Sequence, residues 1–133
     1  MLLESNNAEQ LCTTLSATPE DCAIIVTYSG STVRIQNEAQ LLHEKGVPII
    51  LLTGLGENAV RPYADYILDV TTRERLYSKV GNFSTNVSVQ LLLDILYSCY
   101  FAADFDKNWN TRLDIAHKIE LHRSSQNEIM REQ

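Results

Sequence analysis

The stretch CAIIVTYSGST, Cys22–Thr32, decides the fold class. Its first six residues are apolar or β-branched and carry no charge, which predicts a strand buried on both faces. The overlapping segment TYSGST, Thr27–Thr32, sets one glycine among five hydroxyl-bearing side chains. A turn needs one Gly and one Ser or Asn, so the surplus of hydroxyl groups at a strand end indicates a binding role as well as a turn.

The same alternation of strand and helix continues along the chain. A helix is predicted from Val33 to Lys45, because three apolar residues recur on one face of it: Ile35, Ala39 and Leu42. The segments PIILLT (48–53) and YILDV (66–70) predict two further strands. Strands spaced about 20–25 residues apart are typical of β-α-β units in a parallel sheet.

Helices are predicted on both sides of this region. One covers Ala8–Leu15, and two C-terminal helices run from about Asn82 to Asp104 and from Trp109 to Ser124. The whole pattern predicts a single α/β domain over residues 1–133, a doubly wound parallel sheet with a helical C-terminus. The helix at 82–104 is apolar on most of its circumference, which favours burial on two sides. A second subunit is the favoured cover, giving a homo-oligomer, most simply a dimer; the last helix is the alternative.

Composition excludes several classes of protein. The chain has 133 residues, 44% of them hydrophobic and 21% charged, with a formal net charge of −6. This acidity argues against nucleic-acid binding by this part of the protein. The three cysteines show neither a disulfide framework nor a metal-ligand spacing, and no targeting segment is evident, so we expect a cytoplasmic protein. The apolar run VQLLLDILYSCYFAA is interrupted by Asp94 and is expected to be too short and polar to span a membrane.

The TYSGST segment is predicted to lie at the carboxyl end of a strand and to lead into a helix. Helix N-termini present free N–H groups that bind phosphate, and a glycine lets the backbone approach. The TYSGST segment contains no Lys and does not match the P-loop pattern, so a ligand with a single monoester phosphate fits it better than a nucleotide triphosphate. The alternative is that Ser31 or Thr32 only caps the helix. From the residues alone, both interpretations stay open.

The pattern T-x-S-G-x-T after an apolar strand resembles the S-x-S-G-x-T signature of the SIS (sugar isomerase) domain. Two further segments, LLHEKGVPIILLTG and NAVRPYADYILDV, are similar to that family in the same order, so the resemblance covers about residues 8–105. It implies a phosphosugar-binding domain. The resemblance places the phosphate-binding hydroxyl groups at Thr27, Ser29 and Thr32, and backbone groups at Tyr28, Gly30 and Ser31. Thr53 either lines the same pocket or only closes a turn.

The segment RERLYSKVGNFSTNVSVQLLLDILYSCYF resembles the effector domain of RpiR-type transcription regulators. In that family a helix-turn-helix domain binds DNA and the SIS domain senses a sugar phosphate. No helix-turn-helix pattern occurs in this chain, and the first strand and Gly/Ser turn of a complete SIS domain are missing, so we expect an N-terminally truncated domain with unpaired strand edges. Ser84 and Thr85 are expected to cap the following helix or to face the ligand.

Catalysis is not expected, because no acid–base pair stands out. Glu57 and Asp65 are the carboxylates nearest the strand ends, and Asp65 fits a structural role better. His117 and His122 are five residues apart, which is not the spacing of a helical metal pair, and neither a metal nor a cofactor is implied. Two alternatives stay open, a sugar-phosphate isomerase and an oligomerisation module without a ligand.

Overall fold

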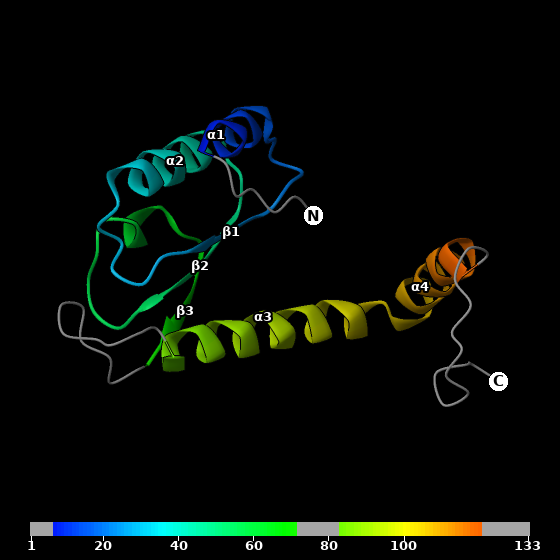
Figure 1. Ribbon diagram of the computed structural model, residues 1–133. Coiled ribbons are helices and arrows are strands. Elements are labelled where there is room, and N and C mark those ends of the chain that lie inside the picture. The colour runs from blue at the N-terminus through cyan, green and yellow to red at the C-terminus, as the bar shows by residue number, and fades with distance from the viewer. Residues whose placement is uncertain (1–6, 72–82, 121–133) are drawn as a thin grey trace. The chain divides into compact units, whose positions relative to one another are not determined.

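The computed structural model describes residues 7–71 and 83–120 (Figure 1). The chain divides into two compact units, and the boundary between them falls within one long helix, between Leu92 and Leu93. Each unit is described by itself. The first holds α1 (Asn7–Ser16), the sheet, α2 (Val33–Glu44), the short 3-10 helix η1 (Arg61–Tyr63) and the start of α3 (Phe83–Ala103); the second holds the rest of α3 and α4 (Phe105–Glu120).

Three parallel strands form the sheet: β1 (Ala23–Val26), β2 (Ile49–Gly54) and β3 (Tyr66–Val70). Their order is β1-β2-β3, so β2 is central and β1 lies at an edge. The three strands were predicted within one or two residues of these bounds, and the α/β class with a parallel sheet is confirmed. The two predicted C-terminal helices are also present, although α4 begins at Phe105, four residues earlier than expected.

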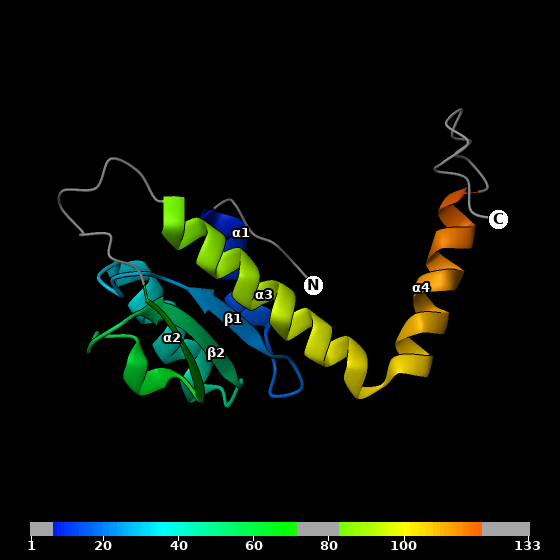
Figure 2. The same ribbon diagram turned by 90° about the horizontal axis from the view of Figure 1, so that it is seen from below.

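Two clusters of buried side chains lie between the sheet and α2. Ala39 of α2 packs with Leu51 and Val60, and Leu42 packs with Val47 and Ile49. When consecutive parallel strands are added side by side in the same direction across a sheet, their right-handed crossover connections all lie on the same face of the sheet. This explains why the α2 and η1 segments cover the same side; α2 lies behind the strands in the view of Figure 2.

The opposite face of β1 departs from the sequence-based prediction. Ile24 is 49% exposed and Val26 47% exposed, whereas Ala23 and Ile25 pack against the α2 side. The prediction that this strand is buried on both faces was therefore wrong for one face. The physical reason is that β1 is an edge strand whose residues alternate between faces, and the layer of α1 and α2 covers only one of them (Figure 1).

Polar contacts fasten the ends of these elements. Arg34 Nη1 in α2 donates to Gln10 Oε1 in α1 at 2.7 Å, which joins the two helices. Between α1 and β1, the carboxylate of Asp21 accepts hydrogen bonds from both the backbone N–H and the hydroxyl of Thr18, each at 2.9 Å. These bonds hold the pKa of Asp21 below its ordinary value. Asp65 accepts a bond from the N–H of Ile49 at 2.8 Å, which agrees with the structural role expected for it.

In the second unit, side chains spaced four residues apart form a series of aromatic contacts from Tyr97 through Phe101 and Phe105 to Trp109. By length and composition, Ser84–Ala103 is able to cross a membrane. The prediction that this region is too short and too polar was therefore wrong on both criteria. One such helix is weak evidence for a membrane span, because the core helix of a soluble protein passes the same test.

Candidate functional site

Two loops meet at the carboxyl edge of the sheet. The TYSGST turn follows β1, and the segment Gly54–Asn58 begins at the last residue of β2. The N–H of Thr27 donates to Leu52 O and the N–H of Gly54 donates to Tyr28 O, each at 3.0 Å. The ladder between the two strands thus continues past the end of β1 and fixes the turn against the next loop. In open parallel sheets this edge is where ligands bind.

Gly30 packs closely against Asn58 of the second loop. Its φ is +62°, in the left-handed region that favours glycine. A Cβ atom added there would lie 2.4 Å from Asn58 Oδ1 and 2.8 Å from Asn58 Cβ. The glycine in TYSGST is therefore required by the backbone conformation and by contact with Asn58.

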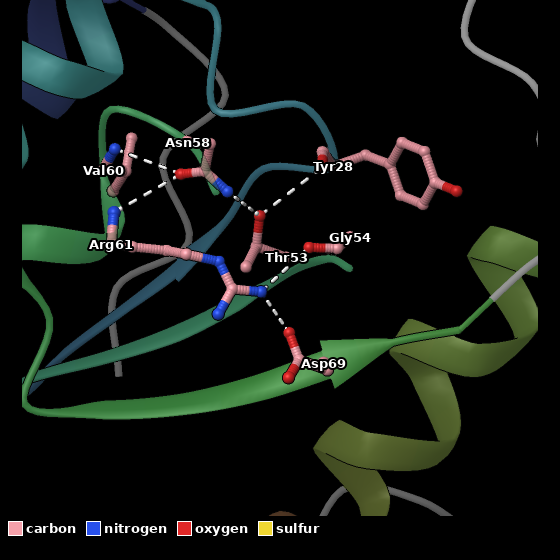
Figure 3. A network of polar contacts seen from close by, with 7 residues as sticks. All are labelled: Tyr28, Thr53, Gly54, Asn58, Val60, Arg61 and Asp69. Atoms are coloured by element: carbon pink, nitrogen blue, oxygen red, sulfur yellow. Dashed lines mark hydrogen bonds and ion pairs between the residues drawn. The ribbon is translucent and has the colours of Figure 1, made fainter. Parts of the chain in front are cut away.

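Asn58 organises the second loop through both ends of its amide (Figure 3). Its Nδ2 donates to Thr53 Oγ1 at 3.0 Å, and its Oδ1 accepts bonds from the N–H groups of Val60 at 3.1 Å and Arg61 at 3.3 Å. The hydroxyl of Thr53, which is fully buried, donates in turn to Tyr28 O at 3.4 Å. The Thr53 hydroxyl thus has one donor bond and one acceptor bond within the protein, which favours the turn-closing interpretation of this residue.

Arg61 ties the ends of β2 and β3 together (Figure 3). Its Nη2 donates to Gly54 O at 3.0 Å and forms an ion pair with Asp69. Its Nε is buried and has no hydrogen-bond partner among the residues that the structure describes. The guanidinium is therefore committed mainly to holding the strand ends in place.

A cleft of about 280 Å³ lies between the two loops. Tyr28 and Ser29 line it on the side of the turn, and Val70 lines it from β3. The second loop contributes the rest of the lining, namely Gly54, Leu55, Gly56, Glu57 and Asn58. The cleft thus has hydroxyl-bearing residues on one side and a carboxylate on the other.

The remaining hydroxyl groups of the turn surround the start of α2. Ser29 Oγ accepts a bond from the N–H of Ser31 at 3.2 Å, and Ser31 Oγ contacts Ser29 O at 3.4 Å. Thr32 occupies the N-cap position of α2 and is exposed, yet its side chain makes no capping hydrogen bond. The alternative in which Ser31 or Thr32 caps the helix through its hydroxyl is therefore not seen. The first-turn N–H groups of α2 lack a side-chain cap.

Of the predicted site residues, Tyr28 and Ser29 line the cleft. The others, Thr27, Gly30, Ser31, Thr32 and Thr53, do not line it. The sequence-based prediction of the site did not include Asn58, Gly54 or Val70, which line the cleft. The glycine-rich segment GLGEN, Gly54–Asn58, was a usable signal for the second loop, whereas contact with β3 was not visible in any local pattern.

Of the other groups considered from the sequence, Glu57 is exposed and lines the cleft. Ser84 and Thr85 lie in the first turn of α3 rather than before it. Within residues 7–71 and 83–120, no group of three or more His, Cys, Asp and Glu side chains is placed to hold a metal ion.

Comparison with known proteins gives consistent results. An uncharacterised HTH-type transcriptional regulator of Thermotoga maritima is 24% identical over 89 residues, which is 67% of this chain and 31% of the regulator. Another, from Clostridium perfringens, is 30% identical over 79 residues, covering 59% of this chain and 28% of the regulator. The chain therefore spans about a third of the length of these relatives.

Among solved structures, the Vibrio vulnificus NanR protein complexed with ManNAc-6P superposes with a TM-score of 0.79 and 17% identity, covering 93% of this chain and 46% of that one. This similarity confirms the fold. The sequence profile of the SIS domain matches residues 4–98, which is more than half of the chain. The chain belongs to the SIS domain family, as the T-x-S-G-x-T pattern led us to expect.

Proposed function

We propose that this chain is a phosphosugar-binding effector domain of a transcription regulator similar to the RpiR type. The observation that carries the proposal is the junction of three features: the TYSGST turn, the uncapped N-terminus of α2, and the cleft beside Ser29. Anionic groups are stabilised at such a helix end by free N–H groups and the helix dipole. The HTH-type regulators to which the chain is similar support the regulatory role.

The two sides of the cleft suit the two parts of a sugar phosphate. We expect the phosphate to take hydrogen bonds from Ser29, Ser31 and Thr32, which are exposed or half-buried hydroxyl groups near the start of α2. The carboxylate of Glu57 repels phosphate and accepts bonds from sugar hydroxyl groups, so it favours one orientation of the ligand. A volume of about 280 Å³ matches a small ligand rather than a dinucleotide. NanR, a structural neighbour, is complexed with ManNAc-6P, which supports this ligand class.

The proposed role is sensing without turnover. The relatives are named as transcriptional regulators, and Asp65 is engaged by the N–H of Ile49. A sugar-phosphate isomerase remains the second candidate because Glu57 lines the cleft and carries a carboxylate. Incubation with aldose and ketose phosphates, followed by chromatographic detection of the interconverted sugar, decides between them. Turnover that is lost in Glu57→Gln would establish the isomerase.

The quaternary and cellular parts of the proposal rest on composition and family. We propose a cytoplasmic homodimer that contacts DNA only through a helix-turn-helix domain outside this chain. Apolar side chains on α3 support the dimer, because Val87 is 69% exposed, Leu91 59% and Ile95 49%. Sedimentation velocity on the wild-type chain tests the dimer directly, and a single monomeric species at micromolar concentration would contradict it.

Ligand binding is tested by a thermal-shift screen against sugar phosphates, run on wild type, Ser29→Ala and Ser16→Ala. Ser16 is an exposed serine at the end of α1, so it is a matched control for the loss of one hydroxyl. Ligands that prefer the folded state raise the unfolding temperature. We expect a rise for wild type and Ser16→Ala that is reduced in Ser29→Ala. An equal rise in all three proteins would remove Ser29 from the site.

A further inference from the structure

The cleft between the two loops carries a negative charge that its lining does not balance. Among the described residues that line the cleft, Glu57 is the only one with a charged side chain at neutral pH. Arg61 lies just beyond the second loop, but its guanidinium is engaged by Gly54 O and by Asp69. Within residues 7–71 and 83–120, no Lys or Arg forms an ion pair with Glu57. The exposed carboxylate of Glu57 is therefore available to a ligand in the cleft.

This charge conflicts with a ligand that is only anionic. A monoester phosphate carries about −1.5 to −2 charges at pH 7. The chain itself has a formal net charge of −6. The free N–H groups at the start of α2 form the positive end of the helix dipole, which is equivalent to only about half a charge. A sugar hydroxyl group can donate to Glu57, but it leaves the repulsion between carboxylate and phosphate in place. A cationic group on the ligand offsets that repulsion, so the charges of the site favour a ligand with both a phosphate and a cation.

The wall of the cleft on the side of the turn includes an aromatic ring. Tyr28 lines the cleft, and in Figure 3 its ring points away from the polar network around Thr53. The ring lies against Gly54, because a Cβ atom added to this glycine would be 3.3 Å from Tyr28 Cε2. The absence of a side chain at Gly54 thus leaves room for the ring beside the cleft. Since the face of an aromatic ring attracts an ammonium group within about 6 Å, this wall also favours a cation.

We propose that the ligand of this cleft is an amino-sugar phosphate with a free amine, whose ammonium group lies between the carboxylate of Glu57 and the ring of Tyr28. A cleft of about 280 Å³ is small enough for one ligand to contact both walls. The inference rests on the phosphosugar-binding function proposed above and narrows its ligand class. Acylation of the amine removes its charge and leaves a neutral N–H donor. An N-acetylated sugar phosphate and a neutral sugar phosphate should therefore both bind, with lower affinity than the free amine.

Titration calorimetry on the full chain compares three ligands that differ only at this group: mannosamine 6-phosphate, N-acetylmannosamine 6-phosphate and mannose 6-phosphate. The corresponding glucose series controls for stereochemistry. The measurements are made at about pH 6.5, where an amine of this kind is protonated. Glu57→Gln removes the charge and keeps the size of the side chain. Glu20→Gln is the matched control, because Glu20 is also exposed but precedes β1 and lies at the other end of the strand.

The wild type and Glu20→Gln should bind the amino-sugar phosphate about tenfold more tightly than either matched ligand, as an exposed ion pair and a cation–π contact together allow. Glu57→Gln should weaken binding of the amino-sugar phosphate and strengthen binding of mannose 6-phosphate, because the repulsion of phosphate is removed. A variant that merely disturbed the loop would weaken the binding of both ligands. Tyr28→Leu should reduce the preference for the amine about threefold.

Two kinds of failure are distinguishable. If the wild type binds none of the phosphorylated sugars, the proposed phosphosugar function fails, and this inference fails with it. If phosphorylated sugars bind but the free amine has no advantage, or if the advantage persists in Glu57→Gln, only the assignment of an amino-sugar phosphate is overturned. An unchanged preference in Tyr28→Leu would overturn the part assigned to the ring.

Discussion

Replacing Gly30 by alanine tests the contact between the TYSGST turn and the loop after β2. The φ of +62° costs an alanine about 1–2 kcal/mol in the left-handed region. The added Cβ would also lie 2.4 Å from Asn58 Oδ1. To relieve that overlap, Asn58 has to move and weaken its bonds to Thr53 and Val60, and overpacking of this kind costs about 1–3 kcal/mol. We therefore expect Gly30→Ala to lower the free energy of unfolding by about 2–5 kcal/mol.

Gly46→Ala is the matched control for this measurement. Its φ is +73°, so the backbone cost is similar, but the nearest atom to an added Cβ is Pro19 Cγ at 3.9 Å. We expect this variant to lose only the backbone cost of about 1–2 kcal/mol. Urea denaturation followed by circular dichroism gives both values, provided that the slope with urea is unchanged. If Gly30→Ala is no more destabilising than Gly46→Ala, the proposed packing of the two loops is refuted.

Three further predictions concern the same unit. Thr53→Val should lower stability by about 1–3 kcal/mol because it leaves the amide of Asn58 without its partner, and by more than Thr53→Ser in urea denaturation; the reverse order would contradict the network. Arg61→Lys should lower the free energy of unfolding by about 1–2 kcal/mol because the bond to Gly54 O is lost. Asp69→Asn should lower it by less than about 1 kcal/mol because Asp69 is 41% exposed. Equal effects of the two variants would show that the bond to Gly54 O contributes no more than the ion pair. Because the pKa of Asp21 is lowered in the folded state, its ionised carboxylate stabilises the fold fully above about pH 3.9, and this stabilisation is lost as the pH falls through the folded-state pKa. Asp21→Asn should therefore remove this acid-dependent part of the free energy of unfolding, measured in unfolding curves over a series of pH values. An unchanged pH profile in the variant would contradict the prediction.

Local patterns were sufficient to predict the sheet. The apolar runs at 22–27, 48–53 and 66–70 correspond to β1, β2 and β3, and Ala39 and Leu42 of the predicted apolar stripe lie in the core. These features depend on periodicity and on residue type, which are readable along the chain. Gly30 was expected to let the backbone approach a phosphate; the close approach in the structure is to Asn58, and the approach to a phosphate stays a prediction.

Other features depend on which elements become neighbours, and periodicity does not encode that. The side chain of Ile24 is exposed because β1 lies at the edge of the sheet. From the sequence alone, this strand was predicted to be buried on both faces. The role of Arg61 follows from its contacts with Gly54 and Asp69, which belong to different strands. Likewise, Thr53 looked equally suited to a pocket or to a turn until its hydroxyl was found between Tyr28 and Asn58.

The central claim, that the turn after β1 binds the phosphate of a sugar phosphate, is tested most directly with one matched pair of ligands. Titration calorimetry compares N-acetylmannosamine 6-phosphate, the ligand of the NanR complex, with the same sugar lacking its phosphate. We expect saturable binding of the phosphorylated sugar to the wild type, at least tenfold weaker binding by Ser29→Ala, and no measurable binding of the unphosphorylated sugar. Equal affinity for the two sugars, or unchanged affinity in Ser29→Ala, would contradict a phosphate site at this turn.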